Sequence, residues 1–289
     1  MTLEQLLDLI ELTDSEKTRI ISLSWRFPRV RELAQEYMSG KVAYADAVAE
    51  FEALVTEEAS VWALDILYVC ECFTLLKKKY DEKGYSEKLF VDSAKDIMVK
   101  IRECVIVRGD IGTVHIGWFE KYFTLERVAC GRLQFGCHTT YPFEKYEKNG
   151  IVLNKGDLIL DCHIPSQMPL PEEACFDAYR RAYEHYSHLF PDGIIKIFCG
   201  SYLLTPQLQH LFGANTRRFA SDFDVVHVRP WDSFHDAWRI FDTKDISDLD
   251  KLPRTTSLQR RFADYMKEGG EFATAFGVIF FDGEKIVNK

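Results

Sequence analysis

The period of the apolar residues changes near residue 124, and this change constrains the fold of the 289-residue chain more than any other feature. Before that point apolar residues recur at helical spacing, as in Val48, Phe51 and Leu54. After it, short apolar or alternating segments are separated by stretches with helical spacing. We therefore predict two domains: an all-helical one over residues 1–123 and a mixed α/β one over residues 124–289.

Local signals predict individual helices in the first domain. Thr13 and Glu16 form a capping-box pair ahead of an apolar stripe. Pro28 predicts the end or a kink of that helix. Residues 61–76 are apolar on almost every side, which predicts a central, buried helix. This half of the chain shows no motif that carries chemistry.

The second domain alternates between strand-like and helical segments, which predicts a mixed sheet flanked by helices. The predicted strands span residues 127–138, 158–164, 194–201, 225–228 and 274–281. The predicted helices span residues 171–189, 205–212 and 257–267.

Composition and charge exclude several classes of protein. Apolar residues make up 47% of the chain and charged residues 28%, which is typical of a globular protein. The net charge of −9 argues against a nucleic-acid partner. No apolar run reaches the length needed to span a membrane, and the N-terminus does not resemble a secretory signal. We therefore expect a cytoplasmic protein without a membrane partner; the oligomeric state is not readable.

The eight cysteines predict neither disulfides nor a metal site. They show no CxxC pair and mostly occupy apolar patterns, which favours buried free thiols in a reducing compartment. The histidines show no metal-ligand spacing either. We accordingly expect no metal cofactor.

Residues 157–212 contain the most informative local pattern. A strand runs into a proline-bearing loop and a helix, and a second strand and helix follow. The helix between the strands makes it natural for them to be parallel neighbours. We predict that their ends splay apart and admit a ligand beside a helix N-terminus, a position that suits a phosphate group.

Strand alternation suggests a polar wall at this place. Asp161 and His163 point to one face of their strand, and Arg132 and Gln134 share a face of theirs. If the two strands pair, these four side chains line a substrate-binding cleft; the alternative is that both sets face solvent.

His163 is the candidate general base, because it ends a strand and can take a proton from an ammonium group or a water. The alternative is a structural histidine that hydrogen-bonds the loop. About 7 Å separates side chains two residues apart on a strand, so we do not expect direct contact with Asp161.

The end of the second strand offers further candidates. Cys199 and Ser201 are predicted to contact substrate. Cys199 with His163 is a possible thiolate pair for covalent acyl transfer, and a buried, inert cysteine is the alternative.

A family resemblance rests on four segments: ERVACGRLQF, CHIPSQMPLPEEAC, CGSYLLTPQL and LPRTTSLQRR. Together they resemble a bacterial family of predicted acyltransferases, with a helical N-terminal domain followed by a domain like the Gcn5-related N-acyltransferases (GNAT). The resemblance covers nearly the whole chain. It implies direct transfer of an acyl group from acetyl-coenzyme A, or another acyl-coenzyme A, to an amine of a small molecule or peptide.

The resemblance also implies roles for particular residues. Tyr202 would protonate the departing thiolate. Ile164, Gln167, Met168 and Leu170 would hold coenzyme A, with the acyl-pantetheine arm between the splayed strands. GNAT proteins usually carry a glycine-rich loop here, whereas this chain has SQMPLPEEA, without glycine. The missing glycines favour an alternative function: a GNAT-like protein that binds a ligand or partner without catalysis.

Overall fold

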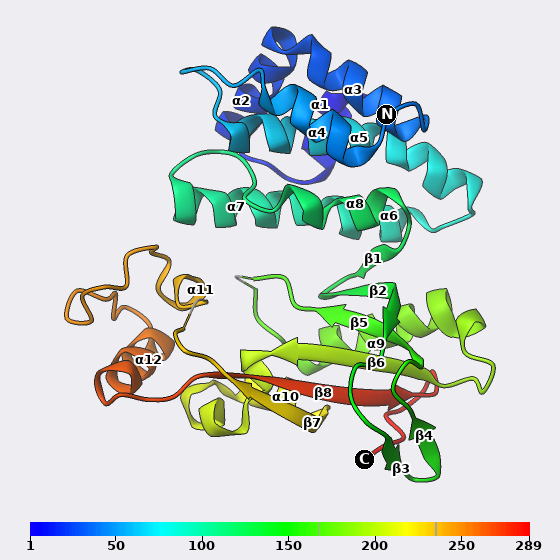
Figure 1. Cartoon of the computed structure of the whole chain (residues 1–289), viewed down its shortest axis with the longest axis vertical. Helices are drawn as coiled ribbons and strands as arrows, with labels where there is room; N and C mark the ends of the chain where they lie inside the picture. The colour runs from blue at the N-terminus through cyan, green and yellow to red at the C-terminus, as the bar shows by residue number, and fades with distance from the viewer. Residues whose placement is uncertain (167, 235) are drawn as a thin grey trace. The chain divides into compact units, whose positions relative to one another are not determined.

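The structure, a computed structural model, describes residues 1–166, 168–234 and 236–289. The chain forms two compact units, Met1–Ala129 and Cys130–Lys289, and each is described by itself (Figure 1). The predicted fold class is confirmed: a helical unit precedes a unit built on a mixed six-stranded sheet.

The first unit is helical, as its apolar spacing predicts. Its helices are α1 (Leu3–Leu9), α2 (Asp14–Arg26), α3 (Pro28–Met38), α4 (Tyr44–Glu52), α5 (Val61–Glu82), α6 (Glu87–Ala94), α7 (Asp96–Arg108) and α8 (Glu120–Phe123), with a 3₁₀ turn at Ile116–Trp118. The capping box of Thr13 and Glu16 starts α2, and Pro28 occupies the first turn of α3. Both local predictions are therefore confirmed.

Helix α5 forms the centre of this unit. Its buried residues lie on nearly all sides of the helix, including Leu64, Leu67, Tyr68 and Phe73. Such a helix can be stable only when neighbours cover every face. Helices α1, α2, α3, α4, α6 and α7 supply that cover.

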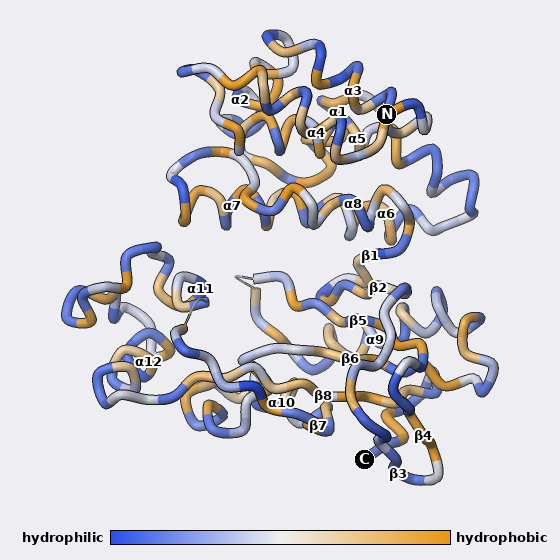
Figure 2. The backbone as a smooth tube through the Cα atoms, in the orientation of Figure 1, coloured by the Kyte–Doolittle hydropathy of each residue, from blue (hydrophilic) through white to orange (hydrophobic). Residues whose placement is uncertain are grey.

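The second unit is built on a sheet with the strand order β1-β2-β5-β6-β8-β7. The strands are β1 (Arg127–Cys130), β2 (Leu133–Thr140), β5 (Leu158–His163), β6 (Ile195–Ser201), β7 (Asp224–Pro230) and β8 (Ala273–Phe281). Strands β5 and β6 are parallel and are connected through α9 (Glu172–Tyr186), whereas β2 with β5, β6 with β8 and β7 with β8 are antiparallel. Figure 2 shows β8 as a mostly apolar stretch, in keeping with its place inside the sheet.

The predicted strand over residues 127–138 is wrong in one respect, because it consists of two strands. A two-residue turn, Gly131–Arg132, separates β1 from β2. Gly131 has a φ of 70°, which glycine adopts without steric cost. The turn reverses the chain, so side-chain alternation does not continue across it.

A hairpin of β3 (Tyr146–Lys148) and β4 (Ile151–Leu153) was not predicted from the sequence. Its turn is Asn149–Gly150, and both residues have positive φ angles. Asn-Gly is a strong signal for such a turn, and the apolar Ile151–Leu153 segment follows it directly.

The remaining helical segments follow the prediction with one change of type. Ser257–Lys267 forms α12, as expected, but the predicted helix over residues 205–212 is a 3₁₀ helix, Pro206–Leu211. Two further helices, α10 (Ala214–Ser221) and α11 (Trp238–Phe241), were not predicted.

The two faces of the sheet carry different cores. Cys162 of β5 and Cys175 of α9 lie close together, so this face of the sheet is covered by α9. The opposite face carries a cluster of Tyr141, Leu153, Ile159, Phe198, Val278 and Phe280. The candidate site described next lies on this second face.

Candidate active site

The parallel strands β5 and β6 part at their carboxyl ends. They pair as far as Asp161 with Phe198. Beyond this pair, β5 continues beside β2 to His163, and β6 continues beside β8 to Ser201. The expected parallel pairing is therefore confirmed. Beyond the last pair, the facing edges of β5 and β6 are not hydrogen-bonded to each other. Their backbone N–H and C=O groups can therefore form hydrogen bonds with a ligand.

Asp161 and His163 are in contact beside this gap. The His163 Nε2 lies 2.7 Å from the Asp161 Oδ2, and the side chains are 28% and 23% exposed. Our expectation that the two side chains lie too far apart is therefore wrong. Side chains on one face of a strand lean along the strand direction, which lets the long imidazole reach the carboxylate. When Nε2–H donates to Asp161, the basic lone pair resides on Nδ1.

Gln134 lies on the same face of the sheet as this pair. It stands directly opposite His163 in the antiparallel pairing of β2 with β5, and opposed residues project to the same face. Its side chain is buried. Gln134, Asp161 and His163 thus share a face as expected, and their contact with substrate stays a prediction.

An aromatic cluster that sequence analysis missed continues this face. The rings of Phe198 and Phe276 are stacked with centroids 5.8 Å apart. Phe143 lies 5.3 Å from Phe276 and 4.6 Å from His227. Alternation along β8 indicates an apolar face, but Phe143 comes from the segment between β2 and β3, which no strand pattern places there.

Gly200 on β6 allows this cluster to close over the strand. It stands opposite Phe276 in the pairing of β6 with β8. A Cβ at Gly200 would lie 2.7 Å from Cε1 of the Phe276 ring, which is closer than real contacts allow. The ring therefore covers the backbone of β6 near the gap, and only glycine leaves room for it.

Arg132 does not belong to the polar wall, which corrects our prediction. It lies in the turn between β1 and β2, and its side chain is 7% exposed. Its Nε donates to the Pro169 carbonyl at 2.7 Å, and its Nη2 donates to the Met168 carbonyl at 2.8 Å. The turn ends the alternation that placed Arg132 beside Gln134, so Arg132 contacts the loop after β5.

Cys199 points away from His163. Its thiol is a buried hydrogen-bonding neighbour of the Cys162 thiol, on the face covered by α9. It lies between Phe198 and Gly200 on β6, so alternation places it on the face opposite Asp161 and His163. The possible Cys199–His163 pair is therefore excluded, and the structure shows the alternative, a buried cysteine.

Ser201 ends β6 and caps the 3₁₀ helix that follows, Tyr202–Leu204. Its Oγ accepts a hydrogen bond from the Leu203 N–H at 3.2 Å. This local role accounts for a serine here, and substrate contact by Ser201 stays a prediction.

Tyr202 lies in an aromatic cluster. Its ring centroid is 5.4 Å from that of Phe234, 6.1 Å from Phe212 and 6.2 Å from Trp231. Burial raises the pKa of the Tyr202 hydroxyl above its ordinary value. The hydroxyl therefore keeps its proton at neutral pH, which a general acid requires.

The loop between β5 and α9 contains the four residues predicted to hold coenzyme A. Ile164 is half-buried, Met168 is 49% exposed and Leu170 is buried. Gln167 lies outside the described residues. The roles of all four residues stay predictions.

Helix α9 begins directly after this loop, and no side chain among the described residues caps it. Its N-cap is Pro171, and the first amide bonded within the helix is that of Cys175, which donates to Pro171. The N–H groups of the first turn are thus available to an anion. The Glu172 carboxylate in this turn is held by the Arg218 guanidinium at 2.7 Å, which offsets its negative charge.

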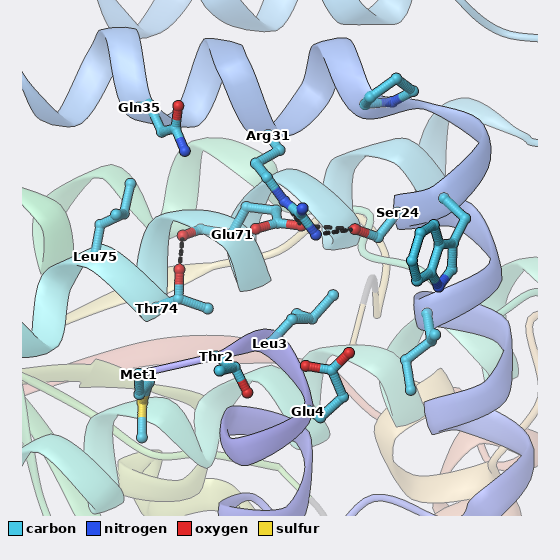
Figure 3. A pocket seen from close by; sticks show the side chains of 13 residues that line it. Met1, Thr2, Leu3, Glu4, Ser24, Arg31, Gln35, Glu71, Thr74 and Leu75 are labelled. Carbon is cyan, nitrogen blue, oxygen red and sulfur yellow. Dashed lines mark hydrogen bonds and ion pairs between the residues drawn. The ribbon is translucent and has the colours of Figure 1, made fainter.

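The helical unit holds a cavity of about 600 Å³. Figure 3 shows Arg31, Ser24 and Glu71 pointing toward one another in it. Arg31 Nη2 donates to Ser24 Oγ at 2.7 Å, and both residues donate to the Glu71 carboxylate. Because these polar groups bind one another, they do not define a ligand for the cavity.

The part of the chain that the structure describes contains neither a metal site nor a membrane-spanning helix. No group of three or more histidine, cysteine, aspartate or glutamate side chains is arranged to hold a metal ion there. Likewise, none of the described helices combines the length and apolar character needed to cross a membrane.

Two family descriptions match the chain, one for each unit. The N-acyltransferase N-terminal domain matches residues 1–125. The GNAT-like C-terminal domain matches residues 128–279, which is more than half of the chain. Among curated proteins, no sequence matches significantly.

Several solved structures share the fold of the whole chain. One is an acyltransferase in complex with decanoyl-CoA and teicoplanin, at 18% identity and a TM-score of 0.72, covering 96% of this chain and 87% of that one. Another is an acyltransferase in complex with decanoyl-CoA, at 16% identity and a TM-score of 0.73, covering 96% and 86%. A third is an acyltransferase variant in complex with octanoyl-CoA, at 17% identity and a TM-score of 0.73, covering 96% and 87%. At these identities the likeness shows the fold.

Proposed function

We propose that this chain transfers an acyl group from acyl-coenzyme A to an amine of a small molecule or peptide. The chain belongs to the N-acyltransferase family, in which an N-acyltransferase N-terminal domain precedes a GNAT-like C-terminal domain. The solved structures of similar fold hold octanoyl- or decanoyl-CoA, and one also holds teicoplanin. They support a medium-length acyl donor and an acceptor of the size of a peptide or glycopeptide.

The observation that carries this proposal is the gap between β5 and β6 with the Asp161–His163 pair at its side. The ladder between the strands ends at Asp161 and Phe198, so backbone groups beyond that pair can bind the pantetheine amides. Ile164, Met168 and Leu170 follow on the loop toward α9, whose first-turn amides suit phosphate groups.

The bound acyl-coenzyme A supplies an activated thioester. In the reaction a C–N bond forms, the C–S bond breaks, and one proton passes from the amine to the thiol. His163 takes the proton from the amine at Nδ1, and the Asp161 carboxylate stabilises the imidazolium that results. Tyr202, which retains its proton, donates to the departing thiolate.

Binding of a small ligand or a partner without catalysis is the second candidate function. It is favoured by the loop SQMPLPEEA, which lacks glycine and contains two prolines that cannot donate a hydrogen bond. Binding and turnover must therefore be measured separately.

The test starts with calorimetric titration of the wild-type protein with acetyl-, octanoyl- and decanoyl-CoA. Release of free coenzyme A thiol is then followed in the presence of amine acceptors, including peptides and a glycopeptide such as teicoplanin. Binding together with acceptor-dependent thiol release supports the transferase. Binding without release contradicts the proposed transfer. Absence of binding also contradicts it and is the result that the second candidate predicts.

The His163→Gln variant separates catalysis from structure. If His163 is the base, we expect turnover to fall by about a hundredfold or more with affinity for acyl-CoA retained. If His163 is structural, the free energy of unfolding falls by about 1–3 kcal/mol and turnover per folded molecule is retained. His138→Gln is the matched control, because His138 is exposed on the neighbouring strand; it should leave turnover and stability unchanged.

A further inference from the structure

The loop that should receive the phosphates of coenzyme A has few backbone donors. Pro169 and Pro171 have no backbone N–H group, so neither can donate a hydrogen bond to a phosphate. A glycine-free loop also adopts the left-handed backbone angles of glycine only at a steric cost. Something outside the loop must therefore determine where its remaining donors point.

Arg132 makes the contacts that determine this geometry. Its guanidinium bridges two successive carbonyls of the loop, those of Met168 and Pro169, at 2.8 and 2.7 Å. In a trans peptide the C=O and N–H groups point in opposite directions. The Pro169 carbonyl shares its peptide with the Leu170 N–H, so binding that carbonyl to Arg132 directs the Leu170 N–H away from Arg132. Among the described residues, this N–H has no acceptor.

Arg132 is also a buried cation with neutral partners. Its side chain is 7% exposed, and its Nη1 is buried without a hydrogen-bond partner among the described residues. Within the same part of the chain, no carboxylate lies within ion-pair distance of the guanidinium. Burying a charge without an ionic partner costs stability, so the positive charge of Arg132 favours an anion bound nearby.

The guanidinium lies beside the first turn of α9. Cys175 in this helix and Cys162 on β5 are close enough to influence the pKa of Arg132, which burial lowers. The uncapped N–H groups of the first turn of α9 add a second source of positive potential at the same place. Two independent features, the helix N-terminus and the unpaired buried arginine, therefore favour an anion here.

We propose that Arg132 is a positioning residue for the phosphate groups of acyl-coenzyme A: it holds the glycine-free loop in its binding conformation and supplies positive charge beneath it. This inference rests on the proposed function. It explains how the chain can bind coenzyme A although the glycines usual in GNAT proteins are missing from the loop.

The experiment compares a ligand that carries phosphates with one that does not. Affinity for coenzyme A is measured by calorimetry, and affinity for pantetheine, which lacks phosphate, by ligand-observed NMR titration. The variants are Arg132→Met and Arg132→Lys. Arg180→Met is the matched control, because Arg180 lies exposed on α9 and pairs with Asp177. The melting temperature of each ligand-free protein reports any purely structural effect.

We expect Arg132→Met to weaken coenzyme A binding by at least about tenfold and to leave pantetheine affinity unchanged. Arg132→Lys keeps the charge but cannot bridge both carbonyls, so its loss should be intermediate. Arg180→Met should behave as wild type.

Equal losses for both ligands, or no loss for coenzyme A, would overturn the inference. If Arg132→Met does not fold, Arg132→Lys decides: wild-type affinity for coenzyme A in that variant overturns the positioning role. Failure of the wild-type protein to bind coenzyme A is a separate result, seen before any variant is tested, and refutes the proposed function together with this inference.

Discussion

Replacing Gly200 by alanine tests how tightly the aromatic cluster closes over β6. The added Cβ would lie 2.7 Å from Cε1 and 2.9 Å from Cδ1 of Phe276. The ring would have to retreat by about 0.7 Å to reach ordinary van der Waals contact at 3.4 Å. It cannot move freely, because Phe198 is stacked on it and Phe143 contacts it edge-on.

The magnitude follows from two opposing effects. Overpacking a closed cluster costs about 1–3 kcal/mol. Replacing a glycine lowers the conformational entropy of the unfolded chain, which stabilises the folded state by about 0.4–1 kcal/mol. Taking the middle of each range, about 2 and about 0.7 kcal/mol, we expect Gly200→Ala to lower the free energy of unfolding by about 1.3 kcal/mol.

Urea denaturation followed by circular dichroism measures this change, and a double-mutant cycle identifies its cause. Phe276→Leu removes the atoms that the new Cβ meets, so the double variant should lose less stability than the two single variants together. Gly117→Ala is the control: nothing lies within 4 Å of a Cβ there, and stability should stay unchanged or rise slightly. Strict additivity in the cycle, or a Gly200→Ala protein as stable as wild type, would refute the reasoning.

Three further predictions concern stability and reactivity. Burial, with a smaller effect of the Glu52 carboxylate, raises the pKa of Asp65 to about 8 from an ordinary value of 3.8. The folded state thus keeps a proton that the unfolded chain releases, so the free energy of unfolding falls as the pH rises from about 4 to about 8. Asp65→Asn should remove this slope in urea titrations at several pH values, and equal slopes would contradict the assignment. Glu103→Gln should cost about 3–5 kcal/mol in the same assay, because it leaves the buried Lys100, 3.0 Å away, without its ionic partner; a loss below about 1 kcal/mol would count against this. Finally, mass spectrometry after alkylation in denaturant should find eight free thiols, all of them protected in the native protein; a stoichiometric disulfide would disprove it.

The sequence by itself determined the fold class and many of the helices and strands in their order. The change of apolar period near residue 124 predicted a helical unit before a mixed sheet, because the spacing of buried residues reflects the local geometry of a helix or strand. The capping box at Thr13 and the position of Pro28 follow from backbone hydrogen bonding within a few residues. The parallel pairing of β5 with β6 followed from the helix between them.

Only the tertiary structure decided how the side chains of the site are directed. Arg132 does not line the predicted polar wall, because a two-residue turn ends the side-chain alternation from which its position was predicted. Asp161 and His163 came into contact through side-chain direction along the strand, which residue spacing does not specify. The cover of Phe276 over Gly200 depends on the register of β6 with β8. Register and turn geometry depend on contacts between segments far apart in the chain, and the local pattern of residues does not contain them.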